Sequence, residues 1–202
     1  MVDFIKEYQI DTDICRTLIE YFKEHPRKAP GLCGDSEWIP LFKSSTDVSL
    51  LEVEFKEDYP VVNYIKALNE CTDKYIEEFP ECSEGIGHWN ISGANIQHYA
   101  PKQGYYKWHC ERTNLNNVTR HLVFSTFLNS VTDGGHTEFK YQKKSVEAVE
   151  GKTIIFPADW TYTHKGRVSE TQDKYIMTGW FNFIEFLDTQ TTPVLDNSTL
   201  RR

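Results

Sequence analysis

Two histidines and one carboxylate are the residues of this sequence whose types and spacing best support chemistry. His109 and Glu111 stand two positions apart in the segment YKWHCE. Residues i and i+2 of an extended chain project from the same face, so one nitrogen ligand and one oxygen ligand would leave the same surface. Cys110 would point the other way. Taken alone, a His-x-Glu pair in a strand is more often a surface ion pair than a metal site.

A second histidine and a lysine extend the pattern. His164 follows a predicted strand, and Lys174, ten positions later, opens the next one. A metal held by two histidines and one carboxylate keeps three positions open, which is the arrangement of non-haem Fe(II) oxygenases. A bidentate 2-oxo acid fills two of these positions and dioxygen the third. The far carboxylate of such a co-substrate needs a cation, and Lys174 is well placed to supply it.

Helices and strands are expected to position these residues. Apolar residues recur at helical spacing in residues 12–26 and again in residues 59–80. Thr12 or Asp13 is the expected cap of the first helix, and Pro26 marks its end. From about residue 88, short runs rich in Val, Ile, Phe, Tyr and Thr alternate with turn residues, which is typical of a sandwich or jelly roll. The predicted strands are ANIQHYA, HLVFSTFLN, HTEFKY, KTIIFPA and KYIMTGWFNFIEF.

Four segments, in this order, resemble the Fe(II)- and 2-oxoglutarate-dependent dioxygenases, specifically the prolyl 4-hydroxylase-like branch. IQHYAPKQGYYKWHCE resembles the tyrosine, glycine and HxD segment of that family, and LVFSTFLNSVTDGGHTEF resembles its core strand and Gly-Gly turn. GKTIIFPA resembles the strand before the distal histidine. HKGRVSETQDKYIMTGWF resembles the distal histidine, the lysine ten positions later and the closing tryptophan strand. The resemblance covers roughly residues 90–185, with weaker similarity in IDTDICRTLIEYF.

The resemblance implies a mainly β fold with flanking helices. It is a double-stranded β-helix, or cupin-like jelly roll, with N-terminal helices packed on one sheet. We expect one domain over residues 1–202, with a helical supporting part at 1–87, the catalytic core at 88–187 and a tail at 188–202. The loop-like composition of residues 29–58 makes this segment the candidate for a lid over the site.

Carried over position by position, the resemblance also implies roles for single residues. The expected iron ligands, which form the catalytic centre, are His109, Glu111 and His164. Lys174 would pair with the distal carboxylate of 2-oxoglutarate, Tyr99 would hydrogen-bond the co-substrate, and Thr126 would offer it another contact.

The resemblance further implies that Trp180 forms a wall of the pocket and that Arg167 faces the substrate.

The sequence departs from the family in two places. Glu111 stands where the usual acid is Asp, so the backbone must lie slightly farther from the iron. His136 stands where the Gly-Gly turn more often leads to an acidic residue.

The implied reaction is hydroxylation of an unactivated C–H bond with Fe(II), 2-oxoglutarate and O2. A prolyl residue in a peptide or protein is the expected substrate, while free amino acids, other protein side chains and small metabolites stay open. One alternative is a non-catalytic jelly-roll module that binds metal. Another is a cupin-like metalloprotein that uses no 2-oxoglutarate, although such a protein has no need of a cation at Lys174.

Composition narrows the partners. The formal net charge of −8 disfavours a phosphate backbone, so no nucleic acid is expected. No apolar run is long enough to cross a membrane. The five cysteines form no CxxC motif, and the charged N-terminus lacks a signal-peptide pattern, so we expect a cytoplasmic protein with reduced thiols. The oligomeric state is left open.

Overall fold

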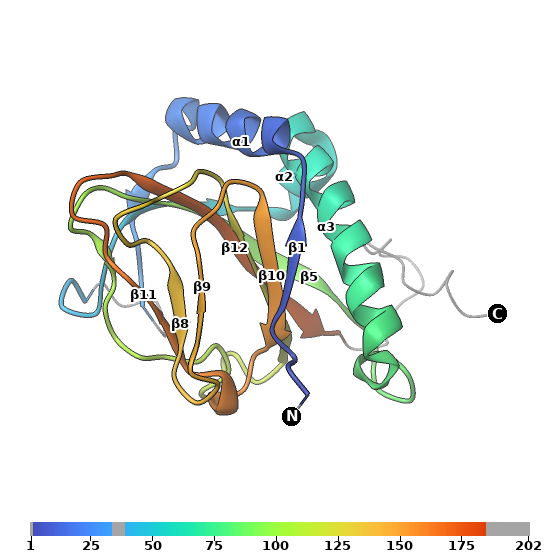
Figure 1. Cartoon of the computed structure of the whole chain (residues 1–202). Coiled ribbons are helices and arrows are strands. Elements are labelled where there is room, and N and C mark those ends of the chain that lie inside the picture. The colour runs from blue at the N-terminus through green and yellow to red at the C-terminus, as the bar shows by residue number, and fades with distance from the viewer. Residues whose placement is uncertain (1, 34–38, 185–202) are drawn as a thin grey trace.

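A seven-stranded antiparallel sheet forms the centre of the molecule (Figure 1). The computed structural model describes residues 2–33 and 39–184. The order of the strands across the sheet is β1-β10-β7-β12-β5-β4-β2. Their bounds are β1 (Lys6–Gln9), β2 (Ala29–Pro30), β4 (Thr46–Leu50), β5 (Trp89–Tyr99), β7 (Arg120–Phe127), β10 (Lys152–Pro157) and β12 (Lys174–Phe183).

A smaller sheet lies against one face of this large sheet. It has the order β11-β8-β9 and consists of β8 (Thr137–Phe139), β9 (Lys144–Val146) and β11 (His164–Gly166). Apolar side chains of both sheets, including Val123, Phe127, Phe139 and Phe156, form one buried cluster. A two-stranded ladder joins β3 (Lys43–Ser44) to β6 (Gly104–Tyr105). Two antiparallel sheets packed face to face confirm the predicted jelly roll with flanking helices.

Helices cover the other face of the large sheet (Figure 1). They are α1 (Thr12–Glu24), α2 (Glu52–Glu57) and α3 (Tyr59–Glu78), while two short 3-10 helices span Pro80–Cys82 and Trp160–Tyr162. Leu18 of α1 and Leu68 of α3 are completely buried in a cluster with Ile96 and Met177 of the sheet. The cap of α1 is Asp11, whose side chain accepts a hydrogen bond from the backbone of Asp13. The predicted cap at Thr12 or Asp13 is therefore wrong by one or two positions.

Alternation along β12 decides which residues reach the space between the sheets. Met177 and Phe181 pack toward the helices. Lys174 and Trp180 have the opposite parity and line the cavity on the other face. Because side chains of a strand alternate between its two faces, a spacing of six places these two residues in the same cavity.

The N-terminal part contributes strands as well as helices. β1 pairs with β10, and β4 pairs with β5 over five residues. The lid predicted for residues 29–58 is therefore wrong for β4, which is an integral strand of the large sheet. Residues 34–38 of that segment and the predicted tail at 188–202 lie outside the described residues. Within the described ranges, no helix is both long and apolar enough to cross a bilayer.

Candidate metal and co-substrate site

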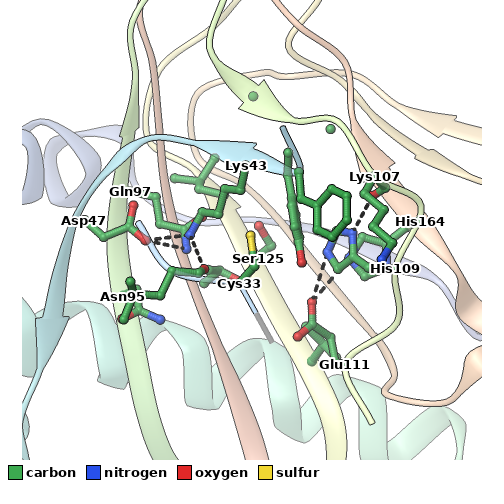
Figure 2. Close-up of a pocket in the computed structure, with 18 of the residues that line it drawn as sticks. Cys33, Lys43, Asp47, Asn95, Gln97, Lys107, His109, Glu111, Ser125 and His164 are labelled. Carbon is green, nitrogen blue, oxygen red and sulfur yellow. Dashed lines mark hydrogen bonds and ion pairs between the residues drawn. The ribbon is translucent and has the colours of Figure 1, made fainter. Parts of the chain in front are cut away.

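His109, Glu111 and His164 converge in a cavity of about 920 Å³ between the two sheets (Figure 2). Their ligand atoms all lie within 4.8 Å of one another. Oε1 of Glu111 is 3.4 Å from Nε2 of His109 and 3.5 Å from Nε2 of His164. The structure thus brings together the three residues that the sequence predicts as ligands, although His164 is separated from the pair by more than fifty positions.

A single β-bridge holds the two histidines in place. The backbone N–H of His109 donates to the carbonyl of His164 at 2.9 Å, and the reverse bond is 2.8 Å long. The predicted strand through residues 109–111 is therefore only an isolated bridge. Farther along, the backbone N–H of Glu111 donates to the carbonyl of Ala158 at 3.2 Å. These backbone contacts orient the three side chains without a regular strand.

Hydrogen bonds of the imidazoles define which nitrogen of each ring is free. Nδ1 of His109 lies 3.0 Å from the carbonyl oxygen of Lys107, and Nδ1 of His164 lies 3.0 Å from that of Tyr162. A carbonyl oxygen only accepts, so both Nδ1 atoms donate, and each Nε2 is the atom that faces Glu111 and can bind a metal once it carries no proton. Two imidazole lone pairs and a carboxylate oxygen repel one another unless a proton or a metal ion lies between them. This donor set fits a divalent metal, and carbonyl partners at Nδ1 are usual for histidine ligands.

Glu111 is held so that only one of its oxygens faces the histidines. Its Oε2 accepts hydrogen bonds from Nε1 of Trp180 at 2.9 Å and from Nη1 of Arg120 at 3.2 Å. The guanidinium of Arg120 also stacks on the Trp180 ring at 3.7 Å and donates to the carbonyl of Glu111. The carboxylate thus offers Oε1 alone as a ligand. Sequence reasoning missed Arg120, because nothing in its neighbourhood separates it from a surface arginine.

The protonation states of the cluster suit metal binding. Burial by itself raises the pKa of Glu111, but the hydrogen bonds and charges of His109 and His164 outweigh it and hold this pKa well below its usual value. Burial, together with repulsion from His164, lowers the pKa of His109. Near neutral pH the acid is ionised and His109 is neutral, which are the forms that bind a cation.

Replacing Glu111 by Asp is expected to weaken metal binding tenfold or more. Aspartate is one methylene shorter, so it cannot place one oxygen near the histidines and keep the other on Trp180 and Arg120. Loss of such supporting bonds typically costs about 10–100-fold in metal affinity. Anaerobic calorimetric titration with Fe(II) measures the change, with Glu111→Gln as the control that keeps the length and loses the charge. Equal or tighter binding by Glu111→Asp would show that the longer acid is a compromise.

Lys174 lies in the same cavity as a buried cation that has no counter-ion among the described residues. Its side chain is 7% exposed, and no acid among the described residues forms an ion pair with it. Its Nζ lies 5.6 Å from the centre of the Tyr99 ring and 5.3 Å from that of Phe127. Burial lowers the pKa of Lys174 to about 8. An uncompensated charge in such a place gains strongly from an anionic ligand.

The affinity for 2-oxoglutarate is expected to fall as the pH rises through about 8. Below this value Lys174 is charged in the ligand-free protein; above it, the lysine must first take up a proton before it can bind a carboxylate. The dissociation constant should then rise by about tenfold for each further pH unit. Anaerobic titration between pH 6.5 and 9.5 measures this, and Lys174→Arg, which stays charged, is the control. A flat profile for the native protein would contradict the role of Lys174.

Tyr99 lies in the cavity, but its hydroxyl already donates a hydrogen bond within the protein. It donates to Oε1 of Gln97 at 2.7 Å. The amide of Gln97 donates in turn to Asp47, which also accepts from Lys43 (Figure 2). The hydroxyl of Ser45 donates to the other oxygen of Asp47. Asp47 accepts only, so the Gln97 amide is fixed with its oxygen toward Tyr99. In this arrangement the tyrosine offers a ligand lone pairs and no proton.

Replacing Tyr99 by Phe is therefore expected to change the affinity for 2-oxoglutarate by less than about fivefold, the contribution of one neutral hydrogen bond. Stability should fall instead, because the oxygen of Gln97 loses its donor in a buried position. Anaerobic titration and urea unfolding measure the two effects. A loss of affinity comparable with that of a Lys174 substitution would show that the bound co-substrate recruits the tyrosine proton.

The co-substrate contact predicted at Thr126 is wrong. This side chain is fully buried on the helix-facing side of β7, where its hydroxyl bonds Tyr64 of α3 at 2.9 Å and Thr153 of β10 at 2.7 Å. Ser125 has the opposite parity and lines the cavity. The sequence places both residues on the same strand, and only its register in the sheet decides which of them faces inward.

Arg167 lines the cavity, and His136 lies beside it, since its carbonyl accepts a hydrogen bond from the backbone N–H of Arg167 at 2.8 Å. Nε of Arg167 and Nε2 of His136 both approach Oε1 of Glu138, at 3.5 Å and 3.4 Å. The side chain of Arg167 is 53% exposed and lines the cavity, as its predicted position facing a substrate requires.

The predicted Gly-Gly turn before His136 is confirmed, because both glycines have a positive φ, +142° at Gly134 and +72° at Gly135.

A jelly roll with two histidines and a carboxylate facing a cavity defines a metal-dependent oxygenase fold and site. Residues 94–182 match the family model of the 2OG-Fe(II) oxygenase superfamily. This match covers the strands and loops that carry the three predicted ligands, and it supports the predicted 2-oxoglutarate-dependent dioxygenase. Its cofactor and co-substrates are Fe(II), 2-oxoglutarate and O2. No curated protein matches the sequence significantly.

Solved structures of prolyl hydroxylases have the same fold. The 2OG complex of viral collagen prolyl hydroxylase from Paramecium Bursaria Chlorella virus-1 has a TM-score of 0.66 at 16% identity, over 91% of this chain and 97% of that chain. A Pseudomonas putida prolyl-4-hydroxylase has a TM-score of 0.67 at 15% identity, over 90% and 93%. The Trichoplax adhaerens prolyl hydroxylase, in complex with a hypoxia inducible factor peptide fragment, has 0.68 at 15% identity, over 90% and 84%.

Proposed function

We propose that this dioxygenase hydroxylates a prolyl residue in a peptide or protein. The observation that carries the proposal is the common cavity, in which His109, Glu111 and His164 face inward and the unpaired Lys174 lies on the same lining. The prolyl part rests on the fold shared with prolyl hydroxylases. One of these structures contains a peptide fragment, which supports a peptide rather than a free amino acid as substrate.

In this proposal the chain holds the reactants and tunes their charges. His109, Glu111 and His164 would hold Fe(II), which together with 2-oxoglutarate and O2 supplies the oxidising power to replace a C–H hydrogen by hydroxyl. Lys174 would bind the distal carboxylate of 2-oxoglutarate and so fix its reacting end near the metal ligands.

Neighbouring residues orient the three metal ligands. Trp180 and Arg120 hold one oxygen of Glu111, which limits the carboxylate to a single ligand atom. Tyr105 packs beside the His109 ring, with 3.6 Å between the ring centres, and Phe156 packs edge-on against the His164 ring. These aromatic neighbours limit the approach of water to the imidazoles.

A two-stage experiment tests the proposal. Purified protein is titrated without O2, first with Fe(II) and then with 2-oxoglutarate, while the visible charge-transfer band of the chelate is followed. O2 is then admitted in the presence of proline-containing peptides, and succinate and the oxidised peptide are measured by mass spectrometry. Hydroxyproline formed together with succinate is the expected result, and Glu111→Ala is the inactive control.

The possible failures separate the parts of the proposal. Succinate release without hydroxylation of any proline peptide would contradict the prolyl substrate and leave the oxygenase. Bound iron without a band on addition of 2-oxoglutarate would contradict the role assigned to Lys174.

A further inference from the structure

Basic side chains line the cavity in excess over acidic ones. Among the described residues, six Lys or Arg and only two Asp or Glu line it, whereas the whole chain carries 22 basic and 30 acidic residues. Both acids already have a basic partner from the same lining. Asp47 pairs with Lys43 at 2.6 Å, and Glu111 pairs with Arg120 at 3.2 Å. The cavity is therefore positive within an acidic protein.

Two of the six basic lining residues, Lys107 and Arg167, lie on the two segments that carry the histidines, and Lys165, outside the lining, follows His164 on the second segment. His109 and His164 exchange backbone hydrogen bonds, so the residues that flank them lie across from one another. Across this bridge, Nζ of Lys165 lies 4.5 Å from the centre of the Trp108 ring. Three basic residues of these two segments, which we call the basic lip, are Lys107, Lys165 and Arg167.

The basic lip has only one acidic partner within the part of the chain that the structure describes. Glu138 lies 3.3 Å from Lys165 and 3.5 Å from Arg167, so a single carboxylate serves two cations. Lys107 lies over the ring of Phe42 at 4.0 Å and forms no ion pair with a described acid. The side chain of Arg167 is 53% exposed, and an ion pair that is exposed on one side at such a distance contributes little free energy and exchanges readily for another partner. The lip can therefore bind further carboxylates.

We propose that the substrate is an acidic peptide segment, in which Asp or Glu residues next to the hydroxylated residue bind the basic lip. This inference rests on the proposed function and names its substrate class. The rings of Trp108 and Phe42 beneath the ammonium groups offer apolar surface to the rest of a peptide. A nucleic acid fits less well, because a long polyanion is repelled by the charge of −8 on the whole chain, whereas a short segment meets mainly the lip.

Binding of matched peptides tests the inference. Three labelled peptides share a central proline and differ only in its flanks, which are Asp and Glu, the amide isosteres Asn and Gln, or Lys. Fluorescence anisotropy is measured on protein loaded with Fe(II) and 2-oxoglutarate in the absence of O2. We expect the acidic peptide to bind about tenfold more tightly than the amide peptide at low salt, with the difference shrinking as salt is added.

Charge reversal assigns the effect to the lip. The double variant Lys107→Glu/Arg167→Glu is expected to lose the preference and to favour the Lys-flanked peptide. Lys66→Glu, on the exposed surface of α3, makes the same kind of charge change away from the cavity and should keep the native preference. The charge-transfer band with 2-oxoglutarate shows whether each variant keeps its site. If the double variant fails to fold, Lys107→Gln/Arg167→Gln replaces it and should abolish the preference without reversing it.

The outcomes separate this inference from the proposed function. Equal affinity for the acidic and amide peptides, or no binding of any of the three, overturns the inference. Admission of O2 then tests the function independently. Acidic peptide that binds preferentially but gains no hydroxyl supports the charge preference and contradicts prolyl hydroxylation. Equal hydroxylation of all three peptides supports prolyl hydroxylation and contradicts the charge preference.

Discussion

Replacing His109 by Ala is expected to abolish turnover and to weaken metal binding by more than about 100-fold. Outer contacts of metal ligands alone are worth about 10–100-fold, so removal of a ligand atom must cost more. The metal-free protein should lose some stability, because the variant removes the contact of the ring with Glu111 at 3.4 Å and its packing on Tyr105, while the rise in unfolding temperature that metal produces should disappear. Anaerobic titration with Fe(II), and thermal unfolding with and without metal, measure the two effects.

A histidine outside the cluster provides the control for this variant. His98 pairs with Asp173 and stacks on Tyr175, away from the metal ligands. His98→Ala should therefore keep both metal binding and the rise in unfolding temperature that metal produces. Native metal affinity in His109→Ala would contradict the assignment of this residue as a ligand, and loss of affinity in His98→Ala would show that the measurement reports general damage.

Replacing Lys174 by Met is expected to abolish 2-oxoglutarate binding and at the same time to stabilise the ligand-free protein. Burial lowers the pKa of Lys174 from 10.5 to about 8, so holding its charge costs the folded state about 3 kcal/mol at pH 7. Methionine fills a similar volume without that cost. Removal of one partner of a buried ion pair costs about 3–5 kcal/mol, so the dissociation constant for 2-oxoglutarate should rise more than about 100-fold.

The sign of this effect with pH gives an independent check. Below pH 8 the lysine is charged in both the folded and the unfolded protein, and the full cost is present. Between pH 8 and 10.5 the unfolded chain binds more protons than the folded one, so the stability of the native protein rises with pH. The difference in free energy of unfolding between Lys174→Met and the native protein should therefore shrink over this range. Urea unfolding at several pH values measures it.

Thr126→Val is the matched control for Lys174→Met. It removes a buried hydroxyl that the structure places on the helix-facing side of the sheet, and it leaves Tyr64 and Thr153 with one partner fewer. We expect a loss of about 1–2 kcal/mol of stability and an unchanged affinity for 2-oxoglutarate. Native 2-oxoglutarate affinity in Lys174→Met would contradict the co-substrate role of the lysine.

Much of the fold could be predicted because its elements have strong local patterns. The helices α1 and α3 carry apolar residues at helical spacing, and the central strands β7, β10 and β12 are rich in apolar and β-branched residues. β1 and β4 were missed. β1 is a polar edge strand of four residues, and β4 is the short run TDVSL, so each depends on pairing with a distant strand.

For the site, too, some features could be predicted from the sequence and others were decided by the tertiary structure. Residue types and spacing, taken together with the family resemblance of the four segments, predicted that His109, Glu111, His164 and Lys174 form one constellation, whereas the His-x-Glu pair alone did not. Only the tertiary structure decided that Ser125 rather than Thr126 faces the cavity, since the register of β7 against its neighbours sets the face of every side chain.

The supporting contacts of the site were likewise decided by the tertiary structure. Arg120 reaches Glu111 across nine positions, Trp180 reaches it from β12, and Gln97 accepts the hydrogen bond that the Tyr99 hydroxyl donates. The sequence determined which atoms can bind a metal and a 2-oxo acid. The packing of β5, β7 and β12 determined how those atoms are held, because hydrogen bonds between segments far apart in the chain exist only once the sheet has formed.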